Sequence, residues 1–351
     1  SIYFSELKNS EGTTPDDVYN YIEKNNYNKF ADLLLELYKS SDIHHRINEV
    51  WENNKNENKD IKQLAILAIM KFVMQINLEF NEMLDLLELD YAILSKYNSE
   101  LIKEFFDVNA DDDVKIRSSV IAKEILYNII GLEDLITTMT ELVKQAGERC
   151  QINIKYGEFI KNLVSHSHFY NFKNKPEAGC LILKFYNDIR NVESCKDNHF
   201  FWVQYASVCI DLCEFQVANT CLDNAYNMSK SIPSFVPYQI DTTKARLKLE
   251  KILFNINSGD KYNSEEVIDI ITEATKLLTK NIDHPDNNVN YVFRLALKFT
   301  DIFDNYKEDF DKRQKSIFTE KIVLLVKLMK THQDKIGFNT KWIEKLEACK
   351  F

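Results

Sequence analysis

Apolar residues recur at helical spacing along most of the chain. Beyond about residue 130 the pattern predicts helices at 133–147, 152–172, 176–192, 198–212, 215–230, 238–256, 263–280, 288–305, 309–332 and 339–349. Pro176, Pro233, Pro237 and Pro285 fall between these segments, where residues that interrupt helices belong. Because short connections make consecutive helices antiparallel neighbours, we expect an all-α fold of helical hairpins.

The first part of the chain has a different order of elements. Residues 61–76 are apolar on most sides and predict a helix at the centre of a domain. Two short amphipathic stretches follow at 80–88 and 90–97. After the turn-forming residues 109–113, apolar and charged residues alternate over 114–117, which is typical of a strand. Three helices followed by a β-hairpin predict a winged-helix-like unit.

These patterns predict three domains. We expect a helical linker segment at 1–55, a winged-helix-like domain at 56–130 and a domain of helical repeats at 131–351. The chain begins with Ser1 and moves directly into helix-like sequence, so we also expect it to be a fragment of a longer protein.

The composition favours helices and excludes some classes of partner. Seven Gly and five Pro among 351 residues are too few to form the many turns of an all-β or Rossmann-type chain. Lys and Arg number 44 against 54 Asp and Glu, and with no basic patch evident we expect no nucleic-acid partner. The most apolar stretch, 64–70, is bracketed by Lys62 and Lys71, so we expect no membrane partner. Seven cysteines, mostly within apolar segments, indicate reduced thiols and a cytoplasmic location.

Residues 201–230 hold three cysteines and allow two interpretations. As a helical hairpin, the stretch has Trp202, Tyr205, Ala206 and Cys209 on one face of its first helix. The second helix has Phe215, Ala218, Leu222 and Ala225 on one face. Small side chains there let two helix axes approach to roughly 8–10 Å. Alternatively, Cys209 and Cys213 could bind zinc with Cys195 and His199 or Cys221. We favour the hairpin and expect no metal, because no C-x-x-C motif is present and a buried thiol behaves as a small hydrophobe.

Other chemical sites are not evident. The chain has no phosphate-binding G-x-x-x-x-G-K-[ST] string, and the acidic run 111–113 is best explained as a solvated turn. His166 and His168 cannot face the same way on one helix, so we expect structural or surface roles for them. No Ser, Cys or His can be placed in a triad. We therefore predict no catalytic residue and no cofactor.

Two stretches carry a resemblance to known proteins. Ala218 follows Trp202 by 16 residues and Ala225 follows Ala218 by 7, which resembles the tetratricopeptide repeat signature. The run 191–250 looks like the C-terminal repeat region of bacterial STAND NTPases, the multidomain ATPases of antiphage defence. The sequence KIRSSVIAKEIL at 115–126 is similar to the end of the winged-helix unit that follows their ATPase core.

The resemblance implies a TPR-like α-solenoid that acts as a sensor. It implies that the chain is a non-enzymatic region that binds a phage protein and triggers oligomerisation of a full-length protein containing an effector and the ATPase core. In tetratricopeptide geometry the inner face of the first helix carries Phe200, Val203, Ser207 and Ile210, which we predict to bind the protein ligand. Packing against a neighbouring hairpin explains Phe200 and Ile210 equally well.

Two other functions stay open. One is a tetratricopeptide-type scaffold or adaptor for host proteins or peptides, although residues 200–212 lack the Lys/Arg clamp usual in peptide-tail receptors. The other is an enzyme whose site the sequence does not reveal.

Overall fold

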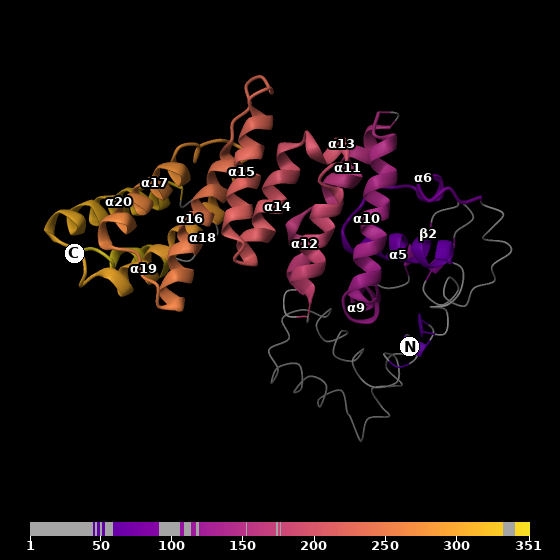
Figure 1. The fold of residues 1–351 in the computed structure, drawn as a ribbon, viewed down its shortest axis with the longest axis horizontal. Coiled ribbons are helices and arrows are strands. Elements are labelled where there is room, and N and C mark those ends of the chain that lie inside the picture. Colours follow the sequence, from indigo (N-terminus) through magenta and orange to yellow (C-terminus); the bar gives the residue numbers. More distant parts are fainter. Residues whose placement is uncertain are drawn as a thin grey trace. The chain divides into compact units, whose positions relative to one another are not determined.

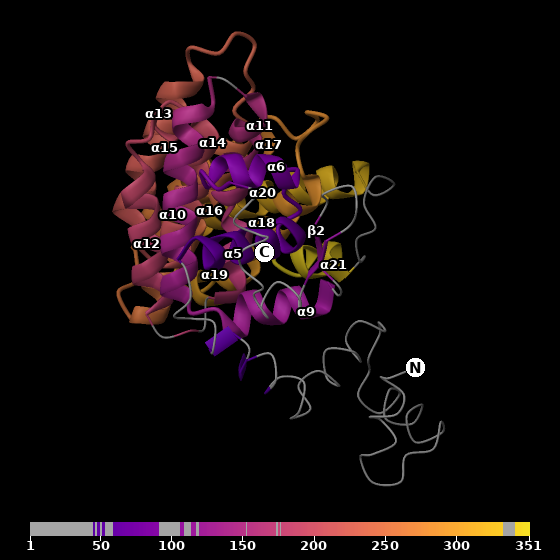
Figure 2. The same cartoon turned by 90° about the vertical axis from the view of Figure 1, so that its right-hand side faces the viewer.

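The described part of the chain is all-α except for two short strands (Figures 1 and 2). The computed structural model describes residues 45, 48–49, 51–52, 59–90, 106–108, 114–116, 119–151, 153–172, 175, 177–332 and 341–351. They divide into two compact units. The first comprises Ser1–Leu163 and Ser167–Val192, and the second comprises Val164–His166 and Glu193–Phe351. Within the described residues, no helix combines the length and apolar character needed to cross a bilayer.

The first unit is built around a helix whose middle seven residues are buried. Its elements are α5 (Lys59–Val73), α6 (Phe80–Leu86), β1 (Phe106–Val108), β2 (Val114–Ile116), α9 (Ser119–Glu124), the π-helix η1 (Ile125–Ile129), α10 (Leu132–Arg149), α11 (Ile154–Leu163) and α12 (Ala178–Ile189). Residues 64–70 of α5 are all buried, which confirms the predicted central helix. Helix α5 packs on α9 and η1, and α10 packs on α11 and α12.

Strands β1 and β2 pair antiparallel, with Phe106 opposite Ile116. The predicted turn at 109–113 and the predicted helix at 90–97 lie outside the described residues. Two strands of three residues do not establish a winged helix, so that assignment stays a prediction. The domain ranges 1–55, 56–130 and 131–351 also stay predictions, because units defined by packing do not test independent folding.

The second unit consists of helices that pack in sequence order. Its elements are α13 (Glu193–Lys196), α14 (His199–Asp211), α15 (Phe215–Ser229), α16 (Tyr238–Ser258), α17 (Ser264–Thr279), α18 (Val289–Ala296), α19 (Lys298–Tyr306), α20 (Lys312–Thr331) and α21 (Lys341–Glu347). Helix α14 pairs with α15, α16 pairs with α17, and α17 lies beside α20 (Figures 1 and 2).

Side-chain caps explain where several of these helices begin and end. The Asn198 side chain accepts a hydrogen bond from the backbone N–H of Phe200 at the start of α14. Capping boxes of Asn263 with Glu266 and of Asp311 with Gln314 begin α17 and α20. Helix α16 ends at Ser258, and the next residue is Gly259, whose φ of 78° lies in the left-handed region that favours glycine.

Two predicted helices are interrupted, and side-chain hydrogen bonds accompany both breaks. The predicted helix 152–172 ends at Leu163, and the 3-10 helix η2 (His166–Phe172) follows. At this break the backbone N–H of His166 donates to the Gln204 side chain at 3.0 Å. The predicted helix 288–305 divides into α18 and α19. There the backbone N–H and the hydroxyl of Thr300 both donate to the Leu297 carbonyl. These two bonds compete with the hydrogen bond that this carbonyl would accept in a continuous α-helix.

The α14–α15 hairpin has the small-residue interface that the sequence predicts. Ala206, Ala218 and Ala225 are each 0% exposed, and Cys209 and Leu222 are also fully buried. Trp202 is half-buried and donates its indole N–H to the carbonyl of Lys196. The hairpin interpretation of residues 201–230 is therefore confirmed.

This interface generates a first prediction. Replacing Ala225 by leucine should lower the free energy of unfolding by about 1–3 kcal/mol, since a larger side chain must separate two closely packed helices. Urea unfolding followed by circular dichroism measures the change. Gln216→Leu places the same side chain at an exposed position of α15 and should change stability by less than about 0.5 kcal/mol. Equal effects of the two substitutions would contradict the interface.

Candidate functional site

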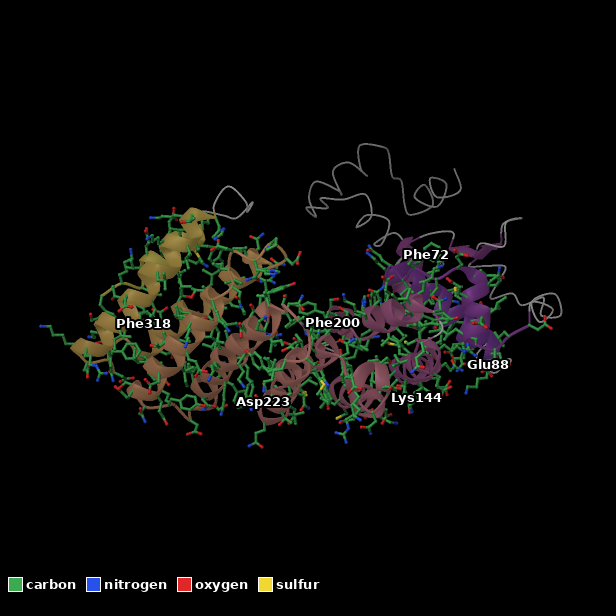
Figure 3. All side chains as sticks on the ribbon, turned by 90° about the horizontal axis from the view of Figure 1, so that it is seen from above. Phe72, Glu88, Lys144, Phe200, Asp223 and Phe318 are labelled. Carbon is green, nitrogen blue, oxygen red and sulfur yellow. The ribbon has the colours of Figure 1, made fainter. Side chains whose placement is uncertain are left out.

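The predicted binding residues all lie on α14. Phe200, labelled in Figure 3, is half-buried at the start of this helix. Val203 is 4% exposed, Ser207 is 8% exposed and Ile210 is 3% exposed. Their burial agrees with the packing explanation that the sequence leaves open for Phe200 and Ile210, and their role in binding stays a prediction.

The cysteines of residues 201–230 have different environments. Cys209 and Cys221 are buried, and a hydrogen bond between them together with burial raises the pKa of the Cys209 thiol. Cys213 is exposed, lies just past the end of α14 and has a φ of 61°. Among the described residues, no three His, Cys, Asp or Glu side chains are grouped so as to bind a metal ion.

A partly buried ionic network begins at the last residue of α14. Asp211 accepts a hydrogen bond from the guanidinium of Arg246 on α16 through one carboxylate oxygen. The other oxygen, Oδ2, lies 2.5 Å from Nε2 of His166. One carboxylate thus joins three segments that are far apart in the sequence.

The network continues along α16 to the next pair of helices. Nε of Arg246 lies 3.9 Å from Glu250 Oε1, and Nζ of Lys298, the first residue of α19, lies 2.9 Å from the same oxygen. Tyr291 of α18 is adjacent to Arg246. Burial raises the pKa of Tyr291 against the opposing effect of that cation, so its phenol stays neutral at physiological pH.

Competing effects set the charge of Asp211. Burial acts to raise the pKa of this carboxyl group, but the hydrogen bond from His166 and the positive charge of Arg246 outweigh burial and hold the pKa below its ordinary value. Because Arg246 is only 9% exposed, its charge depends on these carboxylates for compensation. The arrangement fixes the positions of α14, α16 and α18–α19.

A second buried carboxylate holds the connection after α17. Asp241 is 1% exposed and accepts hydrogen bonds from the Tyr226 hydroxyl at 2.6 Å and from the Asn281 amide at 2.9 Å. Nζ of Lys280 lies 3.4 Å from the same residue. This cluster joins α15, α16 and the residues that follow α17.

Sequence reasoning did not find either network. His166 is 45 residues from Asp211, and Arg246 is 35 residues from it, so no local spacing relates them. One feature of the sequence could have indicated the Arg246 contacts. Arg246 lies three residues before the buried Leu249, which places a charged residue on an apolar face of the helix. For His166 the prediction of a structural or surface role is compatible with its contact to Asp211.

Comparisons with known proteins identify no relative. No family model matches the chain, and neither the curated proteins nor the solved structures contain a significant match.

The cysteine environments generate a second prediction. Iodoacetamide at pH 8 should modify the exposed Cys180 in the native protein, whereas Cys195, Cys209 and Cys221 should react only after unfolding in urea. Mass spectrometry of the digested protein gives the extent of modification at each position. Labelling of native Cys209 as fast as that of Cys180 would show that the α14–α15 interface is open.

A third prediction concerns acid stability. A carboxyl group whose folded-state pKa is depressed stabilises the fold above its unfolded pKa of about 3.9, and this contribution is lost as the pH falls through the folded-state value. Asp211→Asn should therefore lower stability at pH 7 and reduce the loss of stability below about pH 4. Urea unfolding from pH 7 to pH 3 measures both effects.

The matched control is Asp223→Asn on α15. Asp223 lies at the outer surface of this helix (Figure 3), where its side chain is 58% exposed, and it contacts Lys244 at 3.4 Å. Its loss should change stability by less than about 1 kcal/mol at any pH. The same pH dependence in both variants would show that Asp211 is not held by its network.

Proposed function

We propose that this chain is a non-enzymatic protein-recognition region. The observation that carries the proposal is the hairpin of α14 and α15, whose fully buried Ala206, Ala218 and Ala225 follow the spacing of a tetratricopeptide repeat. Stacked helical hairpins present extended surfaces, and proteins of this architecture use such surfaces for binding.

We further propose that the chain is the C-terminal sensor region of an antiviral STAND ATPase and is cytoplasmic. The resemblance of residues 191–250 and 115–126 to such proteins supports this proposal. The order α5, α6, β1, β2 and α9 is compatible with a winged-helix-like domain at 56–130, which would adjoin the ATPase core of the same polypeptide. The remaining helices would form the TPR-like α-solenoid.

Binding would act through a shift between existing conformations. A phage protein that binds one arrangement of sensor and ATPase core more tightly favours that arrangement by its difference in affinity. Oligomerisation of the full-length protein would follow. The network of Asp211, Arg246 and Glu250 supports this mechanism, because it makes neighbouring helices move together rather than singly.

The alternative is a tetratricopeptide-type scaffold or adaptor that binds host proteins or peptides. The same hairpin architecture supports it. The two functions differ in the source of the ligand, which is a phage in the first and the host in the second.

The fourth prediction concerns whether the ligand is a phage protein. The immobilised chain should retain one dominant phage protein from an extract of phage-infected bacteria, and the purified phage protein should bind the chain directly in a calorimetric titration. Retention of host proteins alone would favour the adaptor. Nucleotide turnover by the purified chain would contradict the non-enzymatic assignment.

Two variants test the predicted binding face of α14. Phe200→Ala should weaken binding of the phage protein, because an aromatic side chain at an interface contributes much of the affinity. Phe254→Ala on α16 is the matched control, since Phe254 is 43% exposed and lies outside the predicted set. An equal loss of affinity in both variants would exclude α14 as the binding face.

A further inference from the structure

Positive charge is concentrated at the C-terminal end of the second unit. Nine Lys and Arg residues but only three Glu residues occur in α20, α21 and the last four residues of the chain, although the whole chain carries a formal charge of -10. The expectation that the sequence has no basic patch is therefore wrong for these helices. It failed because the charges are separated in sequence by the apolar positions of amphipathic helices.

Part of this charge lines an open groove between α20 and α21. The groove has a volume of about 480 Å³ and is lined by Val323, Val326, Lys327, Lys330, Thr331, Glu347 and Lys350. The other four α20 residues follow Val323 by three, four, seven and eight positions, so all five share one face of the helix. Val323 is 47% exposed, so apolar surface is accessible within the groove.

Packing between α20 and the C-terminal residues holds the two sides of the groove together. Phe318 of α20, labelled in Figure 3, is 0% exposed. Its ring centroid lies 6.3 Å from that of the C-terminal Phe351, and the Phe351 backbone N–H donates to the hydroxyl of Thr319. The C-terminal residues and α20 are therefore held together, and Lys350 has a fixed place at the rim.

Among the described residues, the lining of the groove carries more positive than negative charge. Nζ of Lys330 lies 2.8 Å from Glu347 Oε1, and this hydrogen bond lowers the pKa of Glu347, while Nζ of Lys350 lies 3.8 Å from the same oxygen. The single carboxylate of the groove is thus shared by two lysines. Within the described residues Lys327 forms no ion pair, so the lining carries a formal charge of two positive units.

We propose that this groove binds an acidic segment of a partner protein that combines Glu or Asp with aliphatic residues. The lysines provide charge complementarity and orient the segment, and the exposed Val323 provides apolar surface. The inference deepens the proposed protein-recognition function and rests on it. It adds a partner contact on α20 and α21 to the contact predicted on α14.

The lining favours a peptide over other anionic partners. Single-stranded nucleic acids bind through aromatic stacking and Arg as well as positive charge, and the groove contains neither an aromatic residue nor an Arg. Small ligands are usually enclosed on most sides, whereas the described residues leave this groove shallow and open.

A fluorescent twelve-residue peptide of alternating glutamate and leucine tests the fifth prediction. It should bind the full chain in a fluorescence-anisotropy titration, and a peptide of alternating lysine and leucine should not bind. Lys327→Glu combined with Lys350→Glu should weaken binding at least about tenfold, because both substitutions replace attraction with repulsion. Added salt should weaken binding to the unmodified chain, since the charges are exposed.

The matched control is the pair Lys251→Glu and Lys276→Glu. These exposed lysines lie on α16 and α17 of the same unit, and the pair changes the net charge by the same amount. Circular dichroism establishes that both variants are folded. Equal weakening by the two pairs, absence of peptide binding, or tighter binding of an oligothymidine through Lys327 and Lys350 would each overturn the proposal.

Binding of the phage protein recovered by the immobilised chain distinguishes failure of the groove proposal from failure of the recognition function. If that protein binds the Lys327→Glu, Lys350→Glu variant as tightly as the unmodified chain, the groove proposal is wrong and the recognition function stands. If the acidic peptide binds the groove but the immobilised chain retains no phage protein, the groove proposal stands and the phage-sensor function is wrong.

Discussion

The close approach of α14 and α15 is the constraint on which the first helices of the second unit depend. Ala206, Ala218 and Ala225 leave room for two helix backbones to come together, and no larger side chain could occupy these fully buried positions without separating them. Cys209 and Cys221 belong to the same interface. Side-chain volume, rather than thiol chemistry, explains why these residue types occur there.

The position of α14 also determines the geometry of the helices that follow. Asp211 is its last residue, and through Arg246 and Glu250 it is linked to α16 and then to Lys298 at the start of α19. Close apolar packing already limits how far helices can slide or rotate, and paired charges of low exposure limit it further. The network therefore gives specific positions to helices whose association is driven by apolar burial.

Local pattern was sufficient for most helices but not for contacts between distant segments. The ends of α14, α15, α16 and α17 follow from caps, breakers and apolar spacing, all of which act within a few residues. The break at Leu163 is marked by a bond between His166 and Gln204, and the Asp211 network joins residues 35 and 45 positions apart. The groove of α20 and α21 likewise depends on which helix faces are not packed against other helices. The spacing of apolar residues along the sequence does not reveal this.

Hydrogen–deuterium exchange along the second unit tests most directly whether the α14–α15 interface is closely packed. The backbone amides of α14 should exchange as slowly as those of α16 and α17, because residues on nearly every side of this helix are buried. Exchange of α14 as fast as that of the short, peripheral α21 would contradict the account.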